Sequence, residues 1–333
     1  MSGNRTKLNR GSVLCLAAAV AFLLTGVLLL HFWEEDHSRV SLDGGGEPEE
    51  ERIYFDGAWY RPRRDVEAVL LMGIDKAALD ETLPVQGVYE QSDFLLLLVI
   101  DQTNMTCTGI HINRDTMAEI QSLTDSGRLE GTFTGQITLA HSYGGSPEIR
   151  CRNAVTAVSK LMYGIRIGKY ISIAMDGIPV LNDLVGGVTV EVTDDFSGVD
   201  ASLAQGETVT LRGQQALTYV RARHGLEDET NVHRMERQRQ YLDALRRRLL
   251  ELWGTSEDFA ASTVMELNDY LVSNCSVEQM SSLADTLEKC GEVHYRTLEG
   301  EAVLNGEYYE FHVDEDALRR TVMELFYERV EKG

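Results

Sequence analysis

The sequence predicts an α/β fold, in which strands alternate with helices along the chain. Two short apolar runs, 69–74 and 94–100, are continuous rather than alternating, which indicates buried strands in a sheet that is covered on both faces. Later segments carry apolar residues at helical spacing, most clearly 147–165 and 233–252. Strands that alternate with helices in this way are typical of an α/β domain.

The remaining elements of the body can be predicted in chain order. Turn-forming residues at 101–104 follow the second strand and lead into a third strand at 105–112. Strands are also expected at 170–174 and 188–192, on either side of a helix at 178–184. The other expected elements are a short helix at 213–219, helices at 257–272 and 276–290, a hairpin that turns at Asn305 and Gly306, and a closing helix at 314–332.

The first 52 residues predict a membrane anchor followed by a linker. Residues 11–33 carry no charge and are long enough to span a bilayer, so we expect a transmembrane helix over 12–33. Basic residues precede this run and acidic residues follow it, which places the tail 1–11 in the cytoplasm and the body outside. A cleaved signal peptide is the alternative, but its apolar segment would be shorter and would end in small residues. Residues 34–52 are typical of a linker, and 53–333 form the extracytoplasmic body.

Charge and cysteine content narrow the classes of function. The formal net charge is −22, which is opposite in sign to a nucleic-acid-binding surface. An acidic body tolerates or recruits divalent cations. None of the five cysteines has CxxC spacing, which disfavours a zinc site. Cys275 and Cys290 could pair outside the cell, but reduced and mostly buried thiols are the favoured interpretation.

Two aspartates at strand ends are candidate metal ligands. Asp75 ends the first predicted strand and Asp93 begins the second. Ligands of α/β proteins bind at strand ends, and two carboxylates that meet there suit a hard divalent cation, Mg²⁺ above all. The alternative is that each aspartate caps a turn.

An Arg-Asp pair follows the third predicted strand. Because the second and third strands form a hairpin, Arg114 returns toward the end of the sheet where Asp93 lies. Arg114 could clamp a phosphate there, and Asp115 could orient it or accept a proton. A structural ion pair is the alternative.

A second basic group lies around the start of the long helix predicted at 233–252. Arg221 and Arg223 are two apart, so their side chains would point the same way in an extended segment. Arg234 and Gln238 are four apart and share one helix face, close to a helix N-terminus that itself attracts anions. A metal beside several arginines indicates phosphoryl chemistry or polyphosphate binding.

These features occur together in a known family. The sequence has no Gly-x-Ser-x-Gly, Walker or His-Glu-x-x-His motif. It resembles the LytR-CpsA-Psr family of wall-glycan ligases over residues 66–250. The matching stretches, in the family's order, are LLMGIDK (70–76), QSDFLLLLVID (91–101), INRDT (112–116), LAHSYGG (139–145), MDGIPVLNDLVGGVTVEV (175–192), LRGQQALTYVRARH (211–224) and HRMERQRQ (233–240).

The resemblance implies a fold and a set of site residues. The implied fold is an α/β/α sandwich with a central mixed sheet and a hydrophobic tunnel for a polyprenyl chain, lined in part by residues 178–192. Residues 251–333 would complete the fold. Asp75 and Asp93 match the pair that holds Mg²⁺. The groups that match pyrophosphate binding are Arg114, Arg221, Arg223, Arg234 and Gln238, and those that match the catalytic groups are Arg114, Asp115, Arg221 and Arg223.

The resemblance also implies a reaction. The protein would be a Mg²⁺-dependent phosphotransferase that moves a polyprenyl-pyrophosphate-linked glycan, teichoic-acid-like or capsular, onto a peptidoglycan sugar hydroxyl at the membrane. A polyprenyl-pyrophosphate hydrolase and a non-catalytic, lipid-binding regulatory ectodomain are the alternatives.

Three places in the sequence depart from the family's usual pattern. Asn113 stands where proline is usual, and Asn231 stands where an acidic residue is common. Gln136-Ile137-Thr138 replaces a frequent Lys-Ile-Asn. These departures leave the pyrophosphate site intact and concern the acceptor side and the general base.

Overall fold

The computed structural model describes residues 52–75, 90–222, 231–253, 257–306 and 308–330. They belong to one compact unit, Arg52–Gly333. Among these residues no helix is both long and apolar enough to cross a bilayer. The predicted tail, the anchor 12–33 and the linker up to residue 51 lie outside the described residues.

A six-stranded mixed sheet forms the centre of the body, as the resemblance implies. Its order is β11-β8-β3-β4-β5-β12. Neighbouring strands β3, β4 and β5 run antiparallel, β8 is parallel to β3, and β12 is parallel to β5. The bounds are β3 Val66–Asp75, β4 Gln91–Asp101, β5 Thr106–Ile112, β8 Lys169–Ala174, β11 Leu271–Ser273 and β12 Val293–Thr297.

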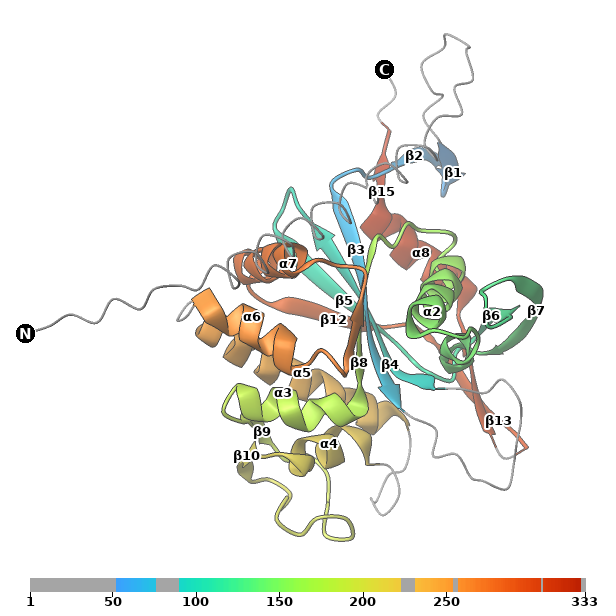
Figure 1. Cartoon of the computed structure of the whole chain (residues 1–333). Helices are drawn as coiled ribbons and strands as arrows, with labels where there is room; N and C mark the ends of the chain where they lie inside the picture. Colours follow the sequence, from blue (N-terminus) through green and yellow to red (C-terminus); the bar gives the residue numbers. More distant parts are fainter. Residues whose placement is uncertain (1–51, 76–89, 223–230, 254–256, 307, 331–333) are drawn as a thin grey trace, which may run out of the picture. The chain divides into compact units, whose positions relative to one another are not determined.

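Helices cover both faces of this sheet (Figure 1). On one face, α2, α8 and the 3-10 helix η1 pack on Leu70, Leu95 and Leu97. On the other face, α7 and α5 pack on Val69 and Leu96. The central strands are therefore buried from both sides, which explains their continuous apolar runs. The bounds are α2 Pro147–Leu161, α8 Glu315–Phe326, η1 Ile137–Ser142, α5 Asn231–Trp253 and α7 Val277–Cys290.

A third cluster of buried side chains lies around the start of α5. It joins α3, α4 and the hairpin of β9 and β10 to α5. The bounds are η2 Met175–Gly177, α3 Ile178–Leu184, β9 Val188–Glu191, β10 Thr208–Leu211, α4 Gln214–Arg221 and α6 Glu257–Glu266.

Several predicted helices end earlier than expected. The helix predicted at 147–165 ends at Leu161, because Tyr163 and Gly164 adopt positive φ angles of 59° and 80° and turn the chain. The helix predicted at 257–272 ends at Glu266 and is followed by edge strand β11. The helix predicted at 314–332 ends at Phe326, after which β15 pairs with β2.

The sequence gives weak signals for the short strands outside the central sheet. A three-stranded sheet joins β1 Ile53–Phe55, β2 Ala58–Pro62 and β15 Tyr327–Arg329. A hairpin of β6 Met117–Leu123 and β7 Leu129–Gln136 follows β5. The hairpin predicted at Asn305 and Gly306 is confirmed as β13 Gly300–Asn305 and β14 Tyr308–Val313. Cys275 and Cys290 are free thiols, as are the buried Cys107 and Cys151.

Candidate active site

The two aspartates predicted to hold a metal lie at one end of the central sheet. Asp75 is the last residue of β3, and Asp93 lies near the start of the neighbouring strand β4. The pairing of the two strands shifts between Gly73 and Ile74, whose partners are Phe94 and Ser92. Asp93 is therefore the extra residue of a bulge, and bulges redirect a side chain at a functional edge.

Arg114 reaches Asp93, as the hairpin geometry predicts. Its guanidinium forms an ion pair with the Asp93 carboxylate and donates a hydrogen bond to Gln91 Oε1 at 2.8 Å. Arg234, in the first turns of α5, places Nη1 3.6 Å from the other oxygen of Asp93. Both arginines are largely buried, so Asp93 neutralises two desolvated cations.

Asp75 has a different environment. Arg221 Nη2 lies 2.9 Å from Asp75 Oδ1, and this arginine is about half exposed. Burial raises the pKa of Asp75, the charge of Arg221 lowers it, and the nearby Asp93 carboxylate raises it again. The two aspartates therefore feel each other's charge, as two ligands of one cation would.

The arginine positions differ in part from the expected ones. Arg221 is the final residue of helix α4, so the expectation that it lies in an extended segment with Arg223 is wrong at this position. The apolar side chains of α4 extend its helix two residues past the predicted end. Arg223 lies outside the described residues.

Arg237 is a residue whose role the sequence does not reveal. It is buried in α5, donates to the carbonyl oxygens of Tyr219 (3.0 Å) and Ala222, and pairs with Asp194. Its guanidinium also lies over the Phe196 ring, 5.4 Å from the centroid. Arg237 thereby fastens α5 to the end of α4, where Arg221 lies. In the sequence, its role is indicated only by its position between the other two arginines of the HRMERQRQ stretch.

The general-base candidate Asp115 lies beside Arg114. Its Oδ1 is 3.6 Å from Arg114 Nε and accepts a hydrogen bond from Gln136 Nε2 at 3.1 Å. The backbone N–H of Asp115 donates to Asn113 Oδ1 at 3.0 Å. Asn113 Oδ1 also accepts from Asn231 Nδ2, and Asn231 in turn accepts from Arg234. All three departures from the family pattern therefore surround the Arg-Asp pair.

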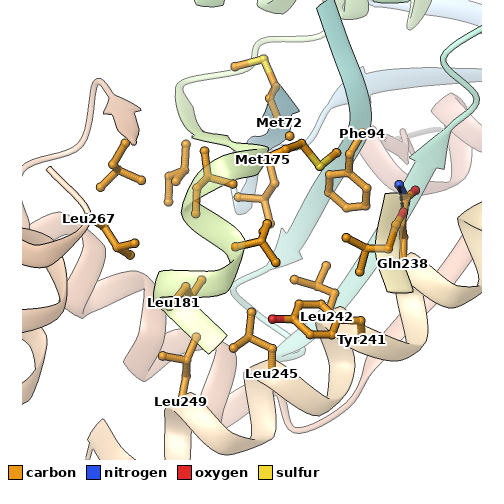
Figure 2. Close-up of a pocket in the computed structure, with 17 residues that line it drawn as sticks. Met72, Phe94, Met175, Leu181, Gln238, Tyr241, Leu242, Leu245, Leu249 and Leu267 are labelled. Atoms are coloured by element: carbon orange, nitrogen blue, oxygen red, sulfur yellow. Dashed lines mark hydrogen bonds between the residues drawn. The ribbon is translucent and has the colours of Figure 1, made fainter. Parts of the chain in front are cut away.

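An apolar cavity of about 270 Å³ opens beside these charged groups, between the sheet and helices α3 and α5. Figure 2 shows Phe94 and Gln238 at one end of it and Leu249 and Leu267 at the other. Phe94 directly follows Asp93, and Gln238 follows Arg234 by one turn of α5, so the charged cluster adjoins that end. Gln238 is buried and donates to the Val220 carbonyl oxygen at 3.2 Å.

The tunnel lining predicted over residues 178–192 coincides with this cavity only in the first residues of that range. Ile178 and Leu181 of α3 line the cavity. Val188 and Val190 instead pack inside the cluster around α4 and α5. Gly73 also belongs to the lining, and a Cβ atom there would lie 3.0 Å from Phe94 Cβ and 3.1 Å from Met175 Cε. A larger residue at this position would therefore crowd the end of the cavity next to the aspartates.

The described residues contain no group of three or more His, Cys, Asp or Glu side chains that could hold a metal. Asp75 and Asp93 nevertheless fit Mg²⁺, which usually takes one or two protein carboxylates and completes its shell with water and substrate phosphates. Burial and, to a lesser extent, the charge of Asp93 raise the pKa of Asp75, and a shared cation would relieve the repulsion between the two carboxylates. Arg114 Nε and Gln238 Oε1 are buried without a hydrogen-bond partner among the described residues.

Comparison with known proteins agrees with this fold. The LytR-CpsA-Psr family profile matches residues 43–326. Biofilm regulatory protein A of Streptococcus mutans is 26% identical over 256 residues, covering 72% of this chain but only 59% of that protein, less than two thirds of its length. The polyisoprenyl-teichoic acid–peptidoglycan teichoic acid transferase TagU of Enterococcus faecalis is 28% identical over 262 residues, 78% of each protein.

Solved structures share the fold. The crystal structure of Bacillus subtilis TagV has a TM-score of 0.58 and 24% identity, and the match covers 79% of this chain and 97% of that one. The family profile spans most of the chain and includes every described residue of the charged cluster. The chain therefore belongs to the LytR-CpsA-Psr family.

Proposed function

We propose that this protein is a phosphotransferase that moves a polyprenyl-pyrophosphate-linked glycan onto a peptidoglycan sugar hydroxyl. The observation that carries the proposal is the position of three arginines and two aspartates at one end of an apolar cavity. A lipid pyrophosphate has the same two parts, a long apolar chain and a compact polyanion. The E. faecalis relative is named as a teichoic acid transferase, which supports the same class of reaction.

The lipid chain of the donor enters the cavity in this proposal. The lining is almost wholly aliphatic and aromatic, so burial of the chain is favourable by about 0.8 kcal/mol for each CH₂ group. The volume of about 270 Å³ lies just below the roughly 300–1,000 Å³ that ligand pockets span. The cavity therefore holds the first few isoprene units, and the rest of the chain extends beyond it.

The pyrophosphate lies over the charged end of the cavity. Arg114, Arg221 and Arg234 present guanidinium groups there, and each can donate two parallel hydrogen bonds to a phosphate. In the ligand-free protein Asp75 and Asp93 neutralise these cations. Asp75 and Asp93 would hold Mg²⁺, which supplies charge neutralisation and polarises the phosphoryl oxygens when bound.

The acceptor hydroxyl attacks the phosphorus nearest the glycan, and polyprenyl phosphate leaves. A phosphodiester bond forms between the glycan and the wall sugar, while the bond between the two phosphates breaks. Asp115 accepts the hydroxyl proton, and its hydrogen bond from Gln136 and its neighbour Arg114 keep the carboxylate oriented. The arginines stabilise the charge that develops on both phosphates.

The setting of this reaction is the outer face of the cytoplasmic membrane. The proposal includes the anchor predicted over residues 12–33 and the extracytoplasmic body. The anchor would keep the charged cluster near lipid donors. The net negative charge of the body disfavours nucleic-acid binding.

The full chain in detergent micelles, given a synthetic polyprenyl-pyrophosphate glycan, Mg²⁺ and peptidoglycan oligomers, tests the proposal. We expect a phosphodiester-linked product, and we expect Arg114→Ala to lower its rate by at least about 100-fold. Arg247→Ala is the matched control, because Arg247 is exposed and pairs only locally with Asp243 at 2.8 Å. Equal losses in the two variants, or no linked product from the wild type, would contradict the proposed function.

A further inference from the structure

The C-terminal hairpin of β13 and β14 is attached directly to the Arg-Asp motif. Phe311 N donates to the Asp115 carbonyl oxygen at 2.9 Å, and Phe311 forms a parallel bridge with Thr116. Gln136 joins the same two segments, because its Nε2 donates both to Asp115 Oδ1 (3.1 Å) and to the Tyr309 carbonyl oxygen (2.7 Å). A single amide thus contacts both the proposed general base and the hairpin.

The two faces of the hairpin have different surroundings. Side chains alternate along a strand, so Tyr309 and Phe311 share one face, and Leu304 lies opposite Tyr309 on the same face. Phe311 packs against the hydrophobic core beneath α2 and α8. Tyr309 and Leu304 continue that face beyond the core and are 55% and 59% exposed. Tyr308 projects from the opposite face and is 70% exposed.

The hairpin and the apolar cavity lie on opposite faces of the central sheet. Phe311 joins the cluster formed with α2 and α8, whereas the cavity lies under α3 and α5. Figure 1 shows the hairpin on the side of α2 and at the end of the sheet where β3 ends and β4 begins. In phosphoryl transfer the attacking and leaving oxygens lie roughly in line, on opposite sides of phosphorus. If the leaving lipid phosphate points to the cavity, the attacking sugar must arrive from the side of the hairpin.

We propose that Tyr309, with Leu304 beside it, is a subsite for the acceptor sugar, a conclusion that rests on the proposed transfer reaction. The C–H face of a pyranose ring packs well on an aromatic ring, and the phenol hydroxyl can remain hydrated. Because the hairpin contacts Asp115 through its main chain, a sugar on Tyr309 is held close to the base that deprotonates it.

The transfer reaction gives the first test, with full-length protein, fixed donor and varied peptidoglycan oligomers. We expect Tyr309→Ala to raise the KM for oligomer by about tenfold, the equivalent of the loss of one good aromatic contact, and to leave donor affinity unchanged. Tyr309→Phe should retain most of the affinity, because the ring is kept. Tyr308→Ala is the matched control, an adjacent and more exposed tyrosine on the other face. An equal effect of the two alanine variants, or none in either, would overturn the subsite.

A binding measurement separates this subsite from the transfer reaction. Saturation-transfer NMR on peptidoglycan oligomers without donor reports contact with the wild-type protein, and we expect Tyr309→Ala but not Tyr308→Ala to weaken the signal strongly. If this holds while the wild type transfers nothing, the proposed function fails and the sugar site stands. If the wild type transfers glycan but the signal is unchanged in Tyr309→Ala, the subsite is wrong and the transfer reaction stands.

Discussion

Asn231 donates its side-chain amide to Asn113 Oδ1 at 2.6 Å, so two of the positions at which this chain departs from its family's pattern are direct partners. Asn113 precedes Arg114, and Asn231 begins α5 and accepts from Arg234. The pair thereby links the segments that carry Arg114 and Arg234, two arginines of the proposed pyrophosphate site. A neutral hydrogen-bonded pair therefore stands where the family pattern usually has a proline and commonly an acidic residue.

The two asparagines should be energetically coupled. Removal of either amide breaks the hydrogen bond between them. Each asparagine also bonds a second group, the Asp115 N–H or the Arg234 guanidinium, and the loss of that second bond appears in a single variant and cancels in the cycle. A double-mutant cycle of Asn113→Ala and Asn231→Ala should therefore give a coupling free energy of about 1 kcal/mol. Urea unfolding of the four proteins measures it. Additive losses would show that the hydrogen bond contributes nothing to stability.

Asp75 and Asp93 should differ in their effect on stability although both are predicted metal ligands. Asp93→Ala leaves the buried Arg114 and Arg234 without their common counter-ion and should cost about 3 kcal/mol. Asp75→Ala removes a carboxylate that pairs with a half-exposed arginine and should change the free energy of unfolding little. Thermal unfolding without divalent cations compares them. Similar melting temperatures for the two variants would contradict the ion-pair arrangement.

The raised pKa of Asp75 determines how the stability of the protein should change with pH. Because burial raises its pKa in the folded protein, the stability that its protonated form provides is lost as the pH rises through that pKa. Asp75→Asn should therefore stabilise the metal-free protein at neutral pH. Mg²⁺ needs the ionised form, so its affinity should fall on acidification at a higher pH than for an ordinary aspartate.

Arg221 offers a check on this interpretation. Its charge lowers the pKa of Asp75, so Arg221→Ala should move the midpoint of the Asp75 titration to higher pH. Carboxyl-carbon NMR of Asp75 in the two proteins measures the midpoint. A midpoint at or below that of the wild type would show that Arg221 does not act on Asp75.

The sequence predicts which side chains gather at the candidate site better than it predicts their partners. Apolar runs locate the ends of β3 and β4, which is enough to bring Asp75 near Asp93. Helical spacing is enough to place Arg234 and Gln238 on one face. The bulge at Asp93 arises only when β3 and β4 pair, and it determines which arginines that carboxylate neutralises. No local pattern could reveal this pairing.

Other features depend on contacts between segments that are distant in the chain. The attachment of β14 to Asp115 joins a hairpin near the C-terminus to the motif after β5, and neither segment carries a signal for the other. Short edge strands such as β11 and β15 have too few residues to show a clear alternation of polar and apolar side chains. The sequence therefore predicts longer helices before them than the structure contains.

Filling the cavity should prevent donor binding and spare the charged cluster. Leu181→Trp places an indole in the space proposed for the lipid chain. The affinity for polyprenyl phosphate should fall at least about tenfold, since the loss of two buried CH₂ groups already has this effect. Leu129→Trp is the control, because Leu129 is exposed on β7. Calorimetry on both variants measures lipid affinity, and unaltered binding by Leu181→Trp would place the chain elsewhere.

The fate of the phosphorus nearest the glycan tests the transfer reaction most directly. A donor that carries ³²P at this position is incubated with the full chain, Mg²⁺ and peptidoglycan oligomers. We predict that the label appears in a phosphodiester with the oligomer and that unlabelled polyprenyl phosphate is released, because a positioned sugar hydroxyl should outcompete bulk water by a large part of roughly 7–11 kcal/mol. Label found only in free glycan phosphate, at a rate that the oligomers do not change, would contradict transfer and establish a hydrolase. Tight binding of polyprenyl phosphate without any turnover would contradict it in favour of a lipid sensor.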